Sequence, residues 1–170
     1  MISDDFVLPQ VDLPDFPYKD QVLSGLPRIL SWRKGQHGPE YAFRFDKLTH
    51  PIVSTIGDAS SNVPVILVIG IVTYEFAGIS HQDEVGVDLA SGALWRISSL
   101  GMVFLNQSPQ IFLDVFRSFE QLLERLKSAN ADARFAMWLE FDEYLKSRDS
   151  LAYESEVSFW PDIIGEALSN

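Results

Sequence analysis

The histidine and acidic residues are the first candidates for chemistry in this chain of 170 residues. The three histidines, His37, His50 and His81, stand apart from one another, and none has the spacing of a metal-binding motif. The nearest approach to a cation site is HQDE at 81–84, which we expect to be a solvated turn with too few ligands for a metal. The sequence predicts neither a metal nor another cofactor.

Carboxylates are the remaining catalytic candidates, because the chain has no cysteine and no recognisable nucleophile motif. They are densest in LEFDEYL, which carries Glu140, Asp142 and Glu143 at helical spacing. Such a cluster more often forms the charged outer face of a helix than an acid–base pair. We therefore predict that the protein is not an enzyme. A hydrolase whose carboxylates meet only in the folded chain is the alternative.

Asp83, Glu84 and Trp95 are the residues that we predict to bind a partner protein. The two carboxylates belong to HQDEVGVD, which we expect to display them on a loop before a hairpin. Trp95 follows the hairpin turn on the face opposite Leu94, where its ring would be half exposed, as tryptophans at the centres of protein interfaces often are. Packing of Trp95 in the core is the alternative, because tryptophan is highly buried on average.

The charge of the chain indicates what kind of partner it suits. It carries 24 acidic and 13 basic residues, a formal charge of −11. An acidic protein repels the phosphate backbone of nucleic acids and is attracted to positively charged surfaces. We expect a basic protein as partner and no direct binding of nucleic acid. A purely solubilising role of the charge is the alternative.

The hydropathy pattern predicts a soluble, cytoplasmic protein. The longest apolar run, at 63–72, is shorter than the roughly 20 residues that a membrane-spanning helix needs. The stretch MISDDFVLPQ carries acidic residues where a secretory signal would carry basic ones. The lack of cysteine is consistent with a reducing compartment.

The order of elements predicts an α+β fold in one domain over 1–170, with helices packed on a mainly antiparallel sheet. Residues 1–30 are rich in proline and should form an extended lead-in that packs on the domain. The expected strands lie at 41–45, 63–76, 85–89, 94–97 and 101–105. The expected helices lie at 109–127, 133–148 and 155–168.

The helix at 109–127 has the clearest signals. Ser108 is a favourable N-cap and Pro109 suits the first helical position. Apolar side chains then recur at spacings of three and four, so that a broad stripe should pack on the sheet. In the following helix we expect an ion pair between Asp142 and Lys146. The residues expected to face inward there are Phe135, Trp138, Leu139 and Leu145.

Three stretches in this order resemble the SUKH superfamily, and within it the fourth group of immunity proteins. They are VGVDLASGALWRI, FLNQSPQIFLDVFRSF and SRDSLAYESEVSFWPDIIGEAL, and the resemblance covers roughly residues 65–168. It implies an α+β domain without a catalytic set, which binds and neutralises a polymorphic toxin, often a nuclease or a nucleic-acid deaminase. No residue role carries over to a numbered position, and the lead-in at 1–30 matches nothing in the family.

From the resemblance and the charge together, we expect a bacterial immunity protein that occludes a basic toxin. A small acidic secretion chaperone for an effector is the alternative. Such a chaperone would be an obligate dimer with an exposed apolar groove for an extended peptide.

Overall fold

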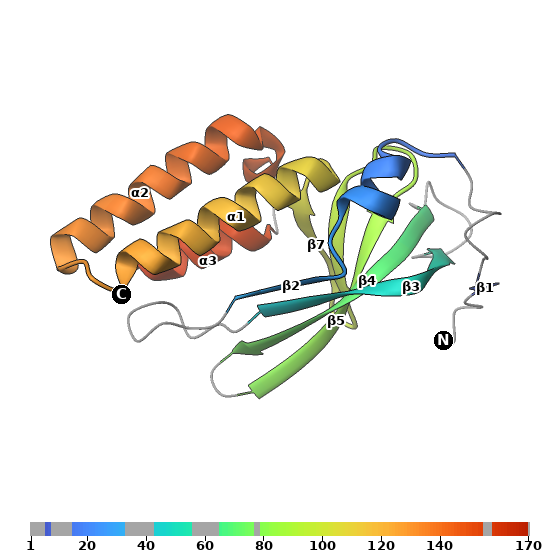
Figure 1. Ribbon diagram of the computed structural model, residues 1–170, viewed down its shortest axis with the longest axis horizontal. Helices are drawn as coiled ribbons and strands as arrows, with labels where there is room; N and C mark the ends of the chain where they lie inside the picture. Colours follow the sequence, from blue (N-terminus) through green and yellow to red (C-terminus); the bar gives the residue numbers. More distant parts are fainter. Residues whose placement is uncertain are drawn as a thin grey trace.

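The fold is described by a computed structural model over residues 6–7, 15–32, 43–55, 65–76, 79–154 and 158–169. Within these ranges the chain forms a seven-stranded antiparallel sheet, followed by three α-helices gathered on one side of it (Figure 1). This architecture confirms the predicted α+β fold. Every helix in the described part of the chain is too short or too polar to cross a membrane.

The sheet is a meander from β3 to β7, because each of these strands pairs with the next one in the sequence. Two short strands, β1 and β2, pair with opposite ends of the outer edge of β3. The strand bounds are β1 Phe6–Val7, β2 Ile29–Trp32, β3 Phe43–Thr55, β4 Val65–Phe76, β5 Ile79–Asp88, β6 Leu94–Ser98 and β7 Gly101–Asn106.

Two glycines shape the sheet. The pairing of β4 with β5 shifts register between Val68 and Gly70. A Cβ atom on Gly70 would lie 2.1 Å from Cε2 of Phe45, so glycine leaves the space that this core ring occupies. Gly92 has a φ of 78° in the turn between β5 and β6, a conformation that favours glycine.

The helices are α1 Pro109–Leu126, α2 Ala131–Arg148 and α3 Phe159–Ser169. The predicted N-cap of α1 is confirmed, because Ser108 Oγ accepts a hydrogen bond from the Ile111 amide at 3.3 Å. The ring of Phe43 on the sheet lies 5.9 Å from that of Phe116 on α1 and 5.6 Å from that of Phe159 on α3. These aromatic contacts join α1 and α3 to the sheet.

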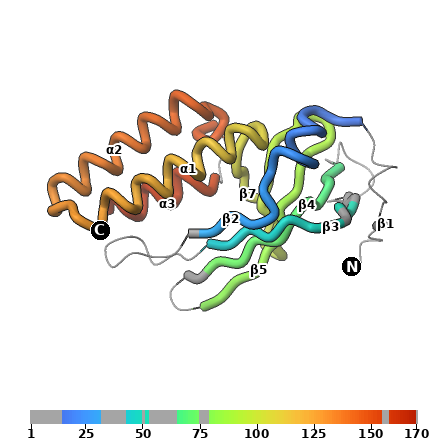
Figure 2. Tube along the Cα trace, in the orientation of Figure 1, coloured from blue at the N-terminus to red at the C-terminus, as the bar shows by residue number. Residues whose placement is uncertain are grey.

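The remaining helix, α2, forms an outer layer. It packs on α1 and α3, and Figure 2 shows it on the side of α1 that faces away from the strands. Trp138 and Phe141 contact the ring of Phe119 on α1, with centroids 6.0 and 5.5 Å apart. The layers therefore follow one another as sheet, then α1 with α3, then α2.

Two of the four side chains expected to face inward on α2 point outward instead. Phe135 and Leu139 are 53% and 42% exposed, whereas Trp138 and Leu145 are buried as predicted, together with Phe141. The expectation was wrong because α2 carries apolar residues on two sides, and helical spacing alone does not tell which side meets the core.

The lead-in at 1–30 is only partly extended. A short π-helix, η2 at Gln21–Gly25, lies where the proline-free segment QVLSG separates the prolines at 17 and 27, and β2 follows it. The expected packing on the domain is confirmed within the described residues, because Phe16, Val22 and Leu26 are buried. Residues 1–5 and 8–14 lie outside the described residues.

The strand predicted at 41–45 is also longer than expected, since β3 continues to Thr55. Its register with β4 is irregular between Lys47 and Ile52, a segment that contains Pro51. Proline cannot donate to the strand ladder and is tolerated at such irregularities. Residues 41–42 lie outside the described residues.

Candidate functional site

Asp83 and Glu84 lie in the middle of a strand, which corrects the predicted loop. β5 begins at Ile79, and the stretch HQDE pairs with β4 in the register His81 with Tyr74 and Glu84 with Ile71. The polar residues at 81–84 suggested a turn, but pairing with an apolar strand holds this segment in an extended conformation. The two carboxylates consequently point to opposite faces of the sheet.

Glu84 and Trp95 share the face that the described helices leave uncovered. Trp95 pairs with Gly86. Ile97, two residues after Trp95, pairs with Glu84, two residues before Gly86. A Cβ atom on Gly86 would lie 3.0 Å from Cδ1 of Ile97, so these positions project to the same side. We call this side the helix-free face.

A row of side chains crosses the helix-free face in register. Its members pair from β3 to β7 in the order Asp46, Ile71, Glu84, Ile97 and Met102, and all five are partly buried. We call this set the Glu84 row. Its two carboxylates alternate with aliphatic side chains, so that acidic groups lie within an apolar surface.

Trp95 lies beside the Glu84 row and is partly buried, as predicted. Its ring stands edge-on to that of Phe104 on β7, with centroids 5.2 Å apart. The expected exposure of Trp95 and its alternative, packing in the core, therefore each hold in part. One side of the tryptophan packs on the core, and the rest remains accessible on the helix-free face.

The first member of the row, Asp46, is held in its charged form. Arg44 donates to both of its carboxylate oxygens, from Nε at 2.6 Å and from Nη2 at 2.8 Å. These bonds lower the pKa of Asp46 below its usual range. Arg44 therefore already neutralises this end of the row. The combination of aliphatic and acidic side chains suits lysine or arginine, whose stems are apolar and whose heads are cationic.

Asp83 is separated from Glu84 and Trp95 by the sheet itself. Its Oδ2 accepts a hydrogen bond from the Tyr74 hydroxyl at 3.1 Å and lies 3.4 Å from Nε of Arg96. The guanidinium of Arg96 also lies over the rings of Tyr74 and Phe159, at 4.9 and 5.6 Å. Only 9% of the Asp83 side chain is exposed, so this carboxylate serves the packing of α3 on the sheet.

Tyr74 and Arg96 were not singled out in the sequence, although one signal for Arg96 was present. In an alternating strand Arg96 shares a face with the buried Leu94 and lies opposite Val85. A basic residue on an inward face requires an acidic partner. Burial raises the pKa of Tyr74, which keeps its hydroxyl protonated as the donor to Asp83.

A second buried polar group joins β7, α2 and α3. Asp149, at the end of α2, accepts from Asn106 Nδ2 at 2.7 Å and from the Gln107 amide at 3.1 Å. Asn106 Oδ1 in turn accepts from Nε1 of Trp160 at 2.9 Å. Asn106, Asp149 and Trp160 are fully buried, and burial raises the pKa of Asp149. The group has no opening to solvent, so its role is to hold the three elements together.

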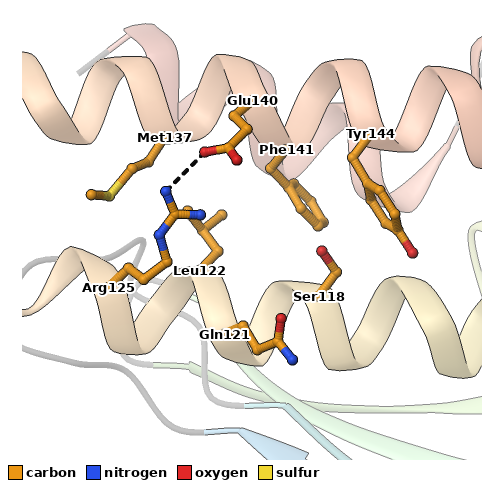
Figure 3. Close-up of a pocket in the computed structure, with 8 residues that line it drawn as sticks. All are labelled: Ser118, Gln121, Leu122, Arg125, Met137, Glu140, Phe141 and Tyr144. Carbon is orange, nitrogen blue, oxygen red and sulfur yellow. Dashed lines mark hydrogen bonds and ion pairs between the residues drawn. The ribbon is translucent and has the colours of Figure 1, made fainter.

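A groove between α1 and α2 has a volume of about 180 Å³ (Figure 3). This is smaller than the roughly 300–1,000 Å³ of typical small-molecule sites. Its single carboxylate, Glu140, pairs with Arg125 at 2.8 Å and has no second acid beside it in the groove. The lining residues are Ser118, Gln121, Leu122, Arg125, Met137, Glu140, Phe141 and Tyr144.

The other two acids of the LEFDEYL stretch lie outside this groove. Lys146 Nζ contacts Asp142 at 2.5 Å and Glu143 at 3.4 Å. The predicted pair between Asp142 and Lys146 is confirmed, and the three carboxylates form part of a charged surface, as expected.

Histidines and acids do not gather into a metal site in the described part of the chain. No group of three or more such side chains there could hold a metal ion. His81 instead stacks on the Tyr74 ring, with centroids 5.0 Å apart. His37 and the side chain of His50 lie outside the described residues.

Comparison with known proteins gives no assignment, since no protein-family model, curated protein or solved structure matches the chain.

Proposed function

We propose that this protein is an immunity protein, which binds a basic toxin through its helix-free face and blocks the toxin's active surface. The observation that carries the proposal is the Glu84 row with Trp95 beside it. It combines an anionic centre, aliphatic neighbours and a partly accessible tryptophan on a chain of charge −11. Tryptophan in particular is enriched at the energetic centres of protein interfaces.

The row would recognise a lysine or arginine side chain of the toxin. The aliphatic stem of that residue would lie on Ile71 and Ile97, and its cationic head would meet Glu84. Trp95 would add apolar contact at the edge of the same site. Toxins that act on nucleic acids carry basic surfaces for phosphate binding, so an anionic inhibitor covers the surface on which their activity depends.

The proposed mode of action is occlusion, and it needs no reaction on this chain. An inhibitor that competes with nucleic acid for a basic cleft prevents catalysis by excluding the substrate. Because only 9% of the Asp83 side chain is exposed and it lies on the face that the helices cover, we assign the contact to Glu84 and Trp95 on the helix-free face.

The proposal is tested by co-expression with a basic toxin encoded in the adjacent reading frame. The wild-type chain should restore growth and bind the purified, catalytically inactivated toxin in isothermal titration calorimetry. A Glu84→Lys/Trp95→Ala variant should lose both properties. Glu124→Lys is the matched control, because Glu124 lies on α1, is 71% exposed and should not affect protection.

Two results would contradict the proposal. Absence of protection and of binding by the wild-type chain would reject the immunity function for that toxin. Protection that is lost equally in the Glu84→Lys/Trp95→Ala and Glu124→Lys variants would reject the helix-free face as the contact site. Circular dichroism of each variant shows whether the fold is retained.

A further inference from the structure

The outer side of α2 carries an unusual share of exposed apolar side chains. Nine large apolar residues are exposed in the described part of the chain, and four of them lie on α2 and on the 3₁₀ turn η3, Ser150–Tyr153, that follows it. These four are Phe135, Leu139, Leu151 and Tyr153. Scattered exposed apolar residues need no explanation, but a concentration of them on one element indicates an interaction surface.

Three of these side chains lie along one part of the surface of α2 and η3. Phe135 and Leu139 are four residues apart and are therefore neighbours on the same side of the helix. Tyr153 adjoins the end of the stripe, since its hydroxyl donates to Asp142 and its ring lies 5.4 Å from Lys146 Nζ. We call Phe135, Leu139 and Tyr153 the α2 stripe.

The α2 stripe differs from the groove between α1 and α2. In Figure 3, Met137, Glu140 and Tyr144 project from α2 toward α1. Phe135 and Leu139 do not line that groove. The side of α2 that faces the core is also occupied, because Trp138 and Phe141 pack on Phe119 of α1. The stripe thus occupies a third side of the helix, which points to solvent.

Acidic residues border the stripe on α2. Asp132 and Glu143 are exposed, and Asp142 follows Leu139 by three residues. The cation within this set, Lys146, is already bound by Asp142 at 2.5 Å and by Glu143 at 3.4 Å. Three carboxylates against one ammonium leave the stripe with a net negative border.

We propose that the α2 stripe docks a cationic amphipathic helix of a partner protein. A helix fits because side chains spaced by four residues form a ridge that packs into the groove of a second helix. Positive charge fits because lysine or arginine on the flanks of such a helix would meet Asp132 and Glu143. A second copy of this chain fits less well, since two copies would bring equal acidic borders together.

This docking site is independent of the proposed immunity function. The stripe lies on the outermost layer, beyond α1 and α3, whereas the Glu84 row lies on the helix-free face of the sheet. The two surfaces lie on different elements and share no residue, so both can be occupied at once. A partner helix on α2 would thus join a second protein to the complex.

The test uses a synthetic amphipathic helix as the probe, about as long as the 18 residues of α2, with leucine on one face and lysine on the other. Isotope-labelled protein is titrated with this peptide, and amide shifts are followed by nuclear magnetic resonance. The largest shifts should fall on the outer side of α2 and on η3. A peptide with glutamate in place of lysine is the matched control and should not bind.

Two sets of variants separate apolar from charged contributions. Phe135→Ser/Leu139→Ser should weaken peptide binding at least about tenfold, as loss of central apolar contacts does at interfaces. Asp132→Lys/Glu143→Lys should weaken it comparably and reduce its dependence on salt. Leu100→Ser, at a residue that is 97% exposed between β6 and β7, should leave peptide binding unchanged.

Three outcomes would overturn the proposal. They are shifts centred on the helix-free face, unchanged affinity in both sets of α2 variants, and a wild-type dimer that becomes monomeric in Phe135→Ser/Leu139→Ser. The last outcome, seen by sedimentation, would assign the stripe to a second copy of the chain. Loss of toxin protection has no bearing on any of them, so the two proposals fail separately.

Discussion

Adjacent residues on β5 have different roles, because neighbouring side chains of a strand point to opposite faces. Asp83 is bonded to Tyr74 and Arg96 on the face that packs against the helices, whereas Glu84 belongs to a row on the other face. The sequence shows two acids side by side. Only the strand register reveals that one supports packing and the other lies on the helix-free face.

This difference predicts unequal effects of charge reversal on stability. Asp83→Lys removes the acceptor of the Tyr74 hydroxyl and places an ammonium beside Arg96, whose side chain is only 18% exposed. It should lower the free energy of unfolding by about 1–3 kcal/mol. Glu84→Lys should cost less than about 1 kcal/mol, as partly exposed positions usually do. Equal losses in urea denaturation would contradict the assignment of the two faces.

The raised pKa of Asp149 predicts that its contribution to stability decreases as pH rises. Its pKa in the folded protein is raised above 3.8 by burial, so the folded state binds the proton more readily than the unfolded state. Its contribution to stability is largest at low pH and declines as pH rises from about 3.8 through the raised pKa. Asp149→Asn retains an acceptor oxygen and does not titrate. Its stability relative to wild type should therefore increase as pH rises across this window.

Asp114 provides a control of opposite sign. Its pKa is lowered by Arg148, which donates to it from α2, so its contribution is present at neutral pH and is lost as pH falls through the lowered pKa. Asp114→Asn should therefore be destabilising at pH 7 and less so in acid. The stability of each variant relative to wild type is measured by thermal unfolding across this pH range. A change in the same direction for both variants would show that the local partners of the two carboxylates do not determine the pH dependence.

At the scale of elements, α1 and α2 differ in how far the sequence determines their packing. The apolar residues of α1 form the predicted stripe, and all of those expected to pack on the sheet are buried or partly buried, although Phe119 contacts α2. The apolar residues of α2 lie on two sides, so the periodicity predicted a helix but not its orientation. Phe135 and Leu139 were consequently assigned to the core, and Phe141 was missed.

Phenylalanines on these two helices give a matched pair of truncations. Phe116 on α1 is fully buried, and its ring contacts those of Phe43 and Phe112 at 5.9 and 6.0 Å. Phe116→Ala should lower the free energy of unfolding by about 3–5 kcal/mol, through lost burial and the cavity that remains. Phe135→Ala, at a residue that is 53% exposed, should cost less than about 1 kcal/mol. A loss below about 1 kcal/mol at Phe116 would contradict the packing of α1 on the sheet.

The candidate site was only partly predictable for a similar reason. Trp95 was expected to be half exposed because it alternates with Leu94, and local alternation is visible in a sequence. The Glu84 row, in contrast, combines residues from five strands, and the place of Asp46 in it depends on the register shift between Lys47 and Ile52. Long-range pairing of this kind has no local signal. The network of Asn106, Asp149 and Trp160 was missed for the same reason.

At the scale of the whole molecule, the charge of −11 bears on how quickly a basic partner arrives. Surface charges act mainly on the encounter, whereas packed contacts determine how long a complex lasts. In the proposed complex, the Glu84 row would contribute to both, since its carboxylates are bordered by aliphatic side chains. Trp95 belongs to the second alone.

If the proposed toxin binds to the helix-free face, its association rate should fall steeply with added salt, while its dissociation rate changes less. Glu84→Lys should lower the association rate at least about tenfold at low ionic strength. Trp95→Ala should instead accelerate dissociation, because it removes apolar contact without changing charge. Glu124→Lys changes the net charge by the same two units as Glu84→Lys but lies on α1, away from the row. Stopped-flow measurements with the three variants therefore separate the effect of the protein's net charge on association from the effect of the charge at residue 84. Equal slowing by both reversals would assign the attraction to net charge and leave Trp95 with its apolar neighbours as the specific contact.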